Sequence, residues 1–323
     1  MACIFSAGSK ASSSSDMSAI AVVDVGSNSI KVAVVDAQDR RELGRLTESV
    51  RLQQAAQPGD PLPVEAQTEA AEAIGRLLDF ARSKGASRFT VLGTSAVREC
   101  ANRQAFAERV RQVTGVPLTI VSGEVEARLA GAGVRTDPAY QAYANIMAFD
   151  LGGGSLEVTA IRSKHYVLAR SFPLGSVRLT NGYLRGGAGV VDELDQLSIR
   201  THLLGALQGV IPAQSAENYL IIGAGGAFAA VALHLEAIGE SAVGGRLPVL
   251  RIRELRDQLC ALDLEGRRKV PGIPADRADI MPAALITLCV LADLTGAEAF
   301  HLSHRGVRHG MVELMLGPSG EHL

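Results

Sequence analysis

The chain has 323 residues, of which 47% are hydrophobic and 20% are charged, as in soluble globular proteins with one large domain or two smaller ones. The 32 basic residues nearly balance the 34 acidic ones, which argues against nucleic acid as the principal partner. The four cysteines have no paired spacing and no apolar run approaches the ~20 residues of a membrane span, so we expect a cytoplasmic protein with reduced thiols.

The chain opens with a polar, serine-rich stretch. Residues 1–16 are typical of a disordered tail rather than of a secretory signal. Residues 19–36 then form two apolar runs around a turn at Gly26–Ser29, which predicts a β-hairpin. Residues 40–53 could extend this sheet as a third strand.

Strands and helices alternate after the first hairpin. Residues 64–85 have apolar side chains at helical spacing and end on Lys84-Gly85, a common helix C-cap. Residues 89–115 begin as a buried strand and continue as one helix that ends near Gly115. Residues 117–134 repeat this strand-to-helix order.

The second half of the chain repeats the first. A hairpin at 146–161 is followed by a third strand at 166–172. The remaining predicted elements are a strand, glycine turn and helix at 218–239, helices near 189–210, 251–265 and 280–296, and a closing strand and helix at 299–316.

The polar stretch 135–143 is the best domain boundary. We therefore expect one domain over 17–137 and a second over 138–323, with a closing helix at about 304–317 that packs back on the first domain. Three strands followed by alternating helices, twice over, predict α/β layers that face one cleft.

The two hairpins share a chemical pattern. Aligning Asp24 with Asp150 places DVGSNSIKV over DLGGGSLEV, with Asp, Gly, Ser and Val in register. A tight turn of Gly and Ser lets backbone N–H groups converge on a phosphate. The predicted phosphate-binding residues of the hairpins are Gly26, Ser27, Asn28, Ser29, Lys31, Gly152, Gly153, Gly154 and Ser155.

Lys31 and Glu157 occupy matching positions with opposite charges. If both turns were only structural, there would be no reason for this difference. Lys31 could pair with a distal phosphate or a nucleotide substituent, although a purely structural role is equally compatible with the sequence.

Eight segments carry a family resemblance: DVGSNSIK at 24–31, GTSAVREC at 93–100, SGEVEAR at 122–128, DLGGGSLEV at 150–158, PLGSVRLT at 173–180, GAGGAF at 223–228, RADIMPAAL at 277–285 and SHRGVRHG at 303–310. In this order the set resembles the exopolyphosphatase and guanosine pentaphosphate phosphatase family, within the actin, sugar-kinase and chaperone ATPase superfamily. The resemblance covers about residues 19–316. It implies two duplicated ribonuclease H-like (actin-like ATPase) domains that face a central cleft.

The resemblance also implies roles for single residues. Glu126 matches the family glutamate that activates water. The alternative is a structural role, in which Glu124 and Glu126 only interact favourably with the dipole at the start of a helix. Arg98 matches an arginine that contacts the scissile phosphate, a task that suits a bidentate guanidinium. Arg277 could bind the outgoing part of a long anion or serve as a structural ion-pair partner.

The implied cofactor is Mg²⁺, held by Asp150, Glu157 and Asp24 and bridging to phosphate oxygens. His301, His304 and His309 have spacings that suit a shared face poorly, so we expect exposed histidines rather than a metal site.

The predicted function is hydrolysis of a terminal phosphoanhydride in inorganic polyphosphate or guanosine pentaphosphate. Two alternatives stay open: a catalytically silent sensor that binds a phosphorylated nucleotide, and a small-molecule kinase built on the same fold. The sequence does not decide which substrate is preferred, what chain length fits, or whether the protein forms a homodimer.

Overall fold

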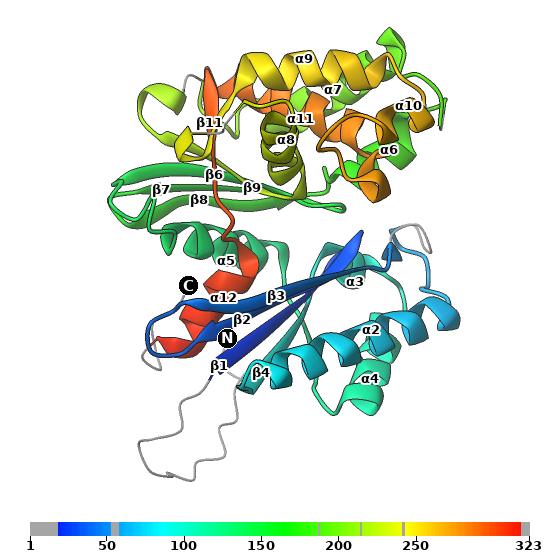
Figure 1. The fold of residues 1–323 in the computed structure, drawn as a ribbon, viewed down its shortest axis with the longest axis vertical. Coiled ribbons are helices and arrows are strands. Elements are labelled where there is room, and N and C mark those ends of the chain that lie inside the picture. Colours follow the sequence, from blue (N-terminus) through cyan, green and yellow to red (C-terminus); the bar gives the residue numbers. More distant parts are fainter. Residues whose placement is uncertain (1–18, 53–57, 187, 214, 241–242, 318–323) are drawn as a thin grey trace.

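The computed structural model describes residues 19–52, 58–186, 188–213, 215–240 and 243–317, so the predicted tail at 1–16 lies outside the described residues. The described chain forms two lobes, each built on one mixed sheet, with helices between them (Figure 1). This confirms the predicted α/β class with two ribonuclease H-like domains. The predicted domain limits, 17–137 and 138–323, stay a prediction.

The first sheet has the strand order β3-β2-β1-β4-β5. Strands β1, β2 and β3 are antiparallel neighbours, whereas β4 runs parallel to both β1 and β5. Asp24 pairs with Lys31 across the predicted hairpin. The bounds of β1 to β5 are Ala19–Val25, Ser29–Asp36, Glu42–Ser49, Ala86–Gly93 and Leu118–Ile120.

The second sheet has the order β10-β11-β9-β6-β7-β8. Strands β6, β7 and β8 repeat the antiparallel arrangement of β1, β2 and β3, and β9 runs parallel to β6. Asp150 pairs with Glu157 in the second hairpin. The bounds of β6 to β11 are Asn145–Leu151, Leu156–Arg162, His165–Phe172, Leu220–Gly225, Arg246–Pro248 and Ala299–Leu302.

The helices cover the outer faces of the sheets and the space between them (Figure 1). Among the described residues, no helix is long and apolar enough to cross a membrane. The bounds of α2 to α12 are Val64–Ser83, Ser95–Glu99, Arg103–Thr114, Gly123–Arg135, Ser176–Tyr183, Glu193–Leu207, Gly226–Ala237, Val249–Cys260, Leu264–Arg268, Met281–Thr295 and Val307–Leu316.

The single helix predicted within residues 89–115 is wrong, because the chain forms two helices, α3 and α4. The break falls at Cys100 and Asn102. The side-chain amide of Asn102 accepts from the backbone N–H of Leu62 at 2.8 Å and donates to its carbonyl oxygen at 2.9 Å. A tertiary contact of this kind competes with helical hydrogen bonding.

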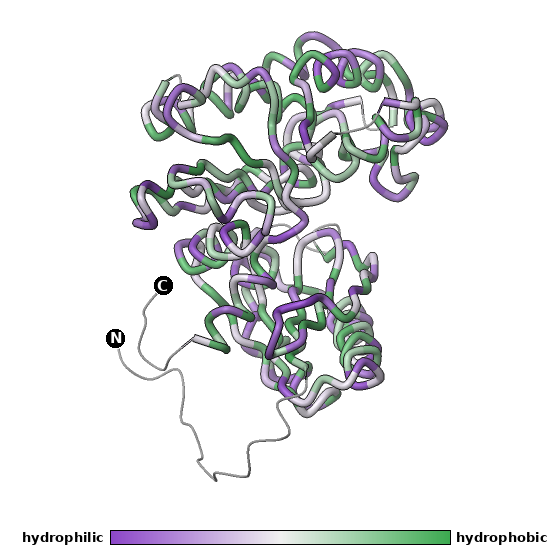
Figure 2. The backbone as a smooth tube through the Cα atoms, turned by 60° about the vertical axis from the view of Figure 1, so that its left-hand side comes forward, coloured by the Kyte–Doolittle hydropathy of each residue, from purple (hydrophilic) through white to green (hydrophobic). Residues whose placement is uncertain are grey.

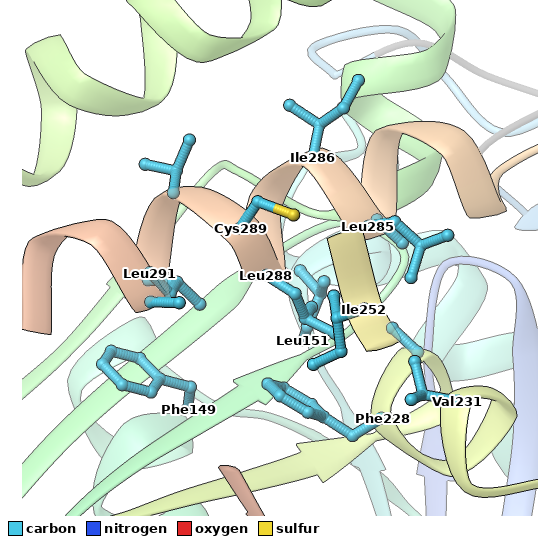
Figure 3. Packing of buried hydrophobic residues seen from close by; sticks show 14 of the residues in the cluster. Phe149, Leu151, Phe228, Val231, Ile252, Leu285, Ile286, Leu288, Cys289 and Leu291 are labelled. Carbon is cyan, nitrogen blue, oxygen red and sulfur yellow. The ribbon is translucent and has the colours of Figure 1, made fainter. Parts of the chain in front are cut away.

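The core of the second lobe lies between its sheet and α11, which is buried along almost its whole length. Phe300 of β11 packs edge-on against Phe149 of β6 and Phe228 of α8. Figure 3 shows Leu288 of α11 facing this aromatic layer. Buried aromatic pairs of this geometry contribute beyond their buried area and fix the relative positions of the elements.

Helices α5 and α12 lie between the two sheets and join the lobes. Helix α12 packs on β1, β2 and α5, and α5 packs on β7 and β8. A buried cluster unites Ile20 of β1 with Leu129 of α5 and Met311 of α12. Figure 2 shows the two lobes from another side, with hydrophobic and hydrophilic residues alternating along the helices, as expected for helices with one buried face.

Candidate active site

A cavity of about 570 Å³ lies between the two lobes, and both hairpin turns line it. A β-carbon added to Gly153 would lie 3.2 Å from Cβ of Ser27 and 3.3 Å from Cβ of Asn28, so the turns face each other closely. The predicted site residues in the lining are Asp24, Gly26, Ser27, Asn28, Ser29, Lys31, Glu126, Asp150, Gly152, Gly153, Gly154, Ser155, Glu157 and Arg277. Every predicted site residue except Arg98 therefore lines this one cavity.

The backbone of the second turn is oriented by α6 and Arg178. The carbonyl oxygen of Gly152 accepts from Ser176 N at 3.0 Å, and that of Gly153 accepts from Val177 N at 2.9 Å. The carbonyl oxygen of Gly154 accepts from Arg178 Nε at 3.0 Å. Because a trans peptide directs its C=O and N–H to opposite sides, the three N–H groups that follow these carbonyls point away from α6. An anion bound on that side of the turn could accept hydrogen bonds from these N–H groups.

Glu126 lies in the first turn of α5 and is 4% exposed. Ser122 caps this helix by accepting from Val125 N at 3.3 Å. Arg98 does not reach the cavity lining but donates through Nη1 to Glu126 Oε2 at 2.7 Å and to the carbonyl oxygen of Val121 at 3.1 Å. Burial raises the pKa of Glu126 to about 7, although Arg98 opposes the shift. A carboxylate with a pKa near neutrality is suited to accept and release a proton.

Glu157, which is buried, and Asp150, which is half-buried, supply two further carboxyl groups. Ser171 of β8 donates to Glu157 Oε1 at 2.7 Å, and burial together with the charges of Glu126 and Asp150 raises the pKa of Glu157 well above its usual range. Burial also raises the pKa of Asp150. Ser171 was not predicted from the sequence, since nothing in its local pattern marks a partner on a neighbouring strand.

Several cations line the same cavity, among them Lys31, Arg277 and Arg308, together with Arg45 and Arg305. Burial lowers the pKa of Lys31 to about 8, and the charges of Arg308 and Arg277 act in the same direction. The guanidinium of Arg277 lies against Gly226, where an added β-carbon would be 1.7 Å from Nη1. Arg308 was not predicted as a site residue, although it lies in SHRGVRHG, one of the segments that carry the family resemblance. Mutually repelling cations in one cavity favour an anionic ligand.

The acidic residues also fit a magnesium ion. Asp24 and Asp150 stand next to the carboxyl ends of β1 and β6, the central strands of the two halves. Asp24 Oδ1 is buried without a hydrogen-bond partner, and Oδ2 is 3.7 Å from Arg308 Nη1. Within the described ranges no three His, Cys, Asp or Glu side chains form a metal cluster. Mg²⁺ commonly binds one or two carboxylates, waters and substrate phosphates, so the two aspartates are a suitable donor set.

The histidine prediction holds only in part. His304 is exposed, but His309 is buried and its Nε2 lies 3.2 Å from Glu42 Oε2. The expectation of an exposed His309 is therefore wrong, because α12 packs this face against the first sheet. Burial lowers the pKa of His309.

Solved structures confirm the predicted fold. An exopolyphosphatase from Cytophaga hutchinsonii superposes with a TM-score of 0.81 at 22% identity, over 92% of this chain and 97% of that one. The Aquifex aeolicus member of the Ppx/GppA family gives a TM-score of 0.76 at 20% identity, over 94% and 99% of the two chains. These likenesses show that the chain shares the fold of these structures, with two duplicated ribonuclease H-like lobes.

Residues 22–317 match the Ppx/GppA phosphatase family, and the chain belongs to this family. An uncharacterized protein of Streptomyces coelicolor is 31% identical over 305 residues, covering 90% of this chain and 88% of that protein. Exopolyphosphatase 1 of Mycobacterium tuberculosis is 29% identical over 91% of this chain and 87% of its own length. The guanosine-5'-triphosphate,3'-diphosphate pyrophosphatase of Aeromonas hydrophila is 25% identical over 92% of this chain, which spans 59% of that protein.

Proposed function

We propose that this protein is a phosphohydrolase that releases the terminal phosphate of inorganic polyphosphate or of guanosine pentaphosphate. The observation that carries the proposal is the position of Glu126, a buried carboxylate whose pKa is raised to about 7 and which opens onto the cavity between the two turns. Relatives named exopolyphosphatase and guanosine-5'-triphosphate,3'-diphosphate pyrophosphatase support this substrate class.

In the proposed reaction the terminal phosphate lies between the two turns. The N–H groups of Gly153, Gly154 and Ser155 donate to its oxygens from one side, and Ser27 and Asn28 contact it from the other. Phosphoryl transfer depends mainly on positioning and charge neutralisation, and this arrangement supplies both. Lys31, Arg277 and Arg308 then neutralise the phosphates beyond the scissile bond.

Glu126 accepts a proton from water while the water oxygen bonds to phosphorus and the phosphoanhydride P–O bond breaks. The products are inorganic phosphate and a substrate that is one phosphate shorter. In this scheme Arg98 holds the Glu126 carboxylate in place through its hydrogen bond at 2.7 Å. When bound by Asp150 and Asp24, with Glu157 beside them, Mg²⁺ would offset the negative charge of the phosphate oxygens.

The test is a phosphate-release assay on the purified chain with tripolyphosphate, longer polyphosphate, guanosine pentaphosphate, and ATP plus sugars, each with and without Mg²⁺. We expect Mg²⁺-dependent release of phosphate from the first three substrates, or from a subset of them. Phosphate transfer from ATP to a sugar would favour a kinase instead. Tight binding of guanosine pentaphosphate without turnover of any substrate would favour a sensor.

The rate of hydrolysis is expected to rise with pH through about pH 7, because burial raises the pKa of Glu126 to about 7 and only the deprotonated carboxylate can accept a proton. Below this pKa the rate should fall about tenfold per pH unit. Above about pH 8, where Lys31 loses its charge, the rate should decline again. Bound Mg²⁺ favours the carboxylate and shifts the midpoint to lower pH without changing the sign. The measurement is kcat/KM from pH 5.5 to 9 at saturating Mg²⁺, and a rate that declines from pH 6 to 8 would contradict the assignment.

A further inference from the structure

Two arginines occupy equivalent places in the two halves of the molecule. Arg51 follows β3, the third strand of the first sheet, and Arg178 follows β8, the third strand of the corresponding hairpin unit in the second sheet. Each one contacts the phosphate-binding turn of its own half through a backbone carbonyl. Each also forms an ion pair with an acidic residue of the other half. The proposed chemistry assigns no task to either of these residues.

Arg51 connects the first turn to the segment that carries Arg277. Its backbone N–H donates to the carbonyl oxygen of Asn28 at 3.1 Å. Its guanidinium pairs with Asp279 at 2.8 Å and also donates to the carbonyl oxygen of Asp276. Ser49 adds a hydrogen bond to the Asp276 carboxylate at 3.0 Å.

The backbone conformation of Arg51 supports a role in joining the two halves of the molecule. Its φ angle is +51°, a left-handed conformation that is unfavourable for any residue with a β-carbon. A backbone conformation of this kind is kept only where the surrounding contacts stabilise it. At Arg51 the stabilising contacts are those that join the two halves of the molecule. The end of β3, which leads into Arg51, lies on the side of the first sheet that faces the second lobe (Figure 1).

Arg178 connects the second turn to α3 of the first half. Its Nε donates to the carbonyl oxygen of Gly154 at 3.0 Å, and its Nη2 pairs with the carboxylate of Glu99. Glu99 is fixed in turn by Ser95, whose hydroxyl donates to Oε1 at 2.8 Å. Glu99 directly follows Arg98, so this contact also ties the second turn to the residue that holds Glu126.

We propose that Arg51 and Arg178 are positioning residues that clamp the two phosphate-binding turns together across the cavity. Both ion pairs have side chains that are 21–28% exposed, so they are partly shielded from solvent and salt. The clamp acts through Asn28 and Gly154 and touches no reacting atom. This inference rests on the proposed function, because the two arginines would hold the turns in the positions in which both turns bind one phosphate chain.

The test compares Arg51→Met, Arg178→Met and their double variant with a matched control, Arg253→Met. Arg253 pairs with Asp293 at 2.6 Å with side chains that are 37% and 28% exposed, but it joins α9 to α11 within one lobe. Asp293 also keeps Arg200 as a partner at 2.9 Å, so the control leaves no unpaired acid. The readouts are KM and kcat for tripolyphosphate, the unfolding temperature, and the radius of gyration from small-angle X-ray scattering.

Each clamp variant is expected to raise KM about tenfold, because a smaller fraction of the molecules holds both turns in place before substrate binds. The double variant should raise KM further and increase the radius of gyration, whereas Arg253→Met should change neither. Arg51→Lys should recover part of the loss, since it keeps the charge facing Asp279 but lacks the second donor for Asp276. A purely structural role would lower the unfolding temperature and leave KM unchanged, and that result would overturn the clamp.

Failure of the clamp and failure of the proposed function can be distinguished. If the wild-type chain releases phosphate from no substrate, the proposed function fails, and scattering still decides whether the two arginines hold the lobes together. If the wild-type chain is active and the clamp variants match it in both KM and radius of gyration, the clamp fails alone.

Discussion

Replacing Glu126 with glutamine is expected to lower the rate of phosphate release by ~10²–10⁴-fold, the usual loss when a positioned general base is removed. Glutamine has nearly the same shape and its side-chain oxygen can still accept from Arg98, but it cannot take a proton from water. The measurement is kcat at saturating Mg²⁺ and tripolyphosphate. Substrate affinity, measured by calorimetry on the variant, should stay close to that of the wild-type chain, because the turns are untouched.

Glu124→Gln is the matched control for this experiment. Glu124 stands on the same first turn of α5, but it is exposed and pairs with Arg128 on the helix surface at 3.2 Å. An exposed pair of this kind contributes little to stability. Its replacement should therefore leave the rate within about twofold of the wild-type rate. Equal losses in both variants, or none in Glu126→Gln, would remove Glu126 from its proposed role.

The sequence predicted the two hairpins well because their signal is local and repeated. Both hairpins form where the aligned motifs place them, and in the structure Asp24 pairs with Lys31 and Asp150 with Glu157. The helix α2 was also predicted closely, since its apolar residues recur at helical spacing and Gly85 adopts the positive φ that ends it. A duplicated motif with a shared polar turn is enough to place both turns at one cleft.

The unpredicted features depend on contacts between distant parts of the chain. The predicted contact of Arg98 with the scissile phosphate stays a prediction, and its ion pair with Glu126, which lies on a different element, was not predicted. Ser171 and Arg308 reach the site from β8 and α12. The sequence around each of them does not indicate which residue it contacts. Asn102 breaks a predicted helix through Leu62 for the same reason. The spacing of hydrophobic residues indicates which face of a helix or strand is buried, but not which side chains of other elements pack against that face.

The position of Glu126 depends on how closely two helices approach. Helix α5 carries Glu126 at its start, and helix α12 carries Arg308 at its start. The packing of the two helices therefore determines where both side chains lie in the site. The crossing is made close by glycine: a β-carbon added to Gly133 would lie 2.0 Å from the carbonyl oxygen of Gly306. Packing at this distance tolerates no added volume, because protein interiors are already filled.

Gly310→Ala is therefore expected to destabilise the protein by about 1–3 kcal/mol and to lower its unfolding temperature by several degrees. The added β-carbon would lie 1.9 Å from the carbonyl oxygen of Leu129, so α12 must move away from α5. That movement disturbs the buried cluster of Leu129 and Met311 and displaces Glu126 from the cavity. Because a misplacement of about 1 Å can cost ~10²-fold in rate, phosphate release should fall as well. Calorimetric unfolding and kcat are the two measurements.

The matched control for Gly310→Ala is Gly205→Ala. Gly205 lies inside α7, is exposed, and has no atom within 4 Å of the position of an added β-carbon. Alanine favours the helix over glycine, so this variant should be stabilised by about 0.5–1 kcal/mol with unchanged kcat. The two substitutions are chemically identical and differ in their surroundings alone. A loss of stability at position 205, or none at position 310, would contradict the close helix crossing that we hold responsible for aligning the two halves of the site.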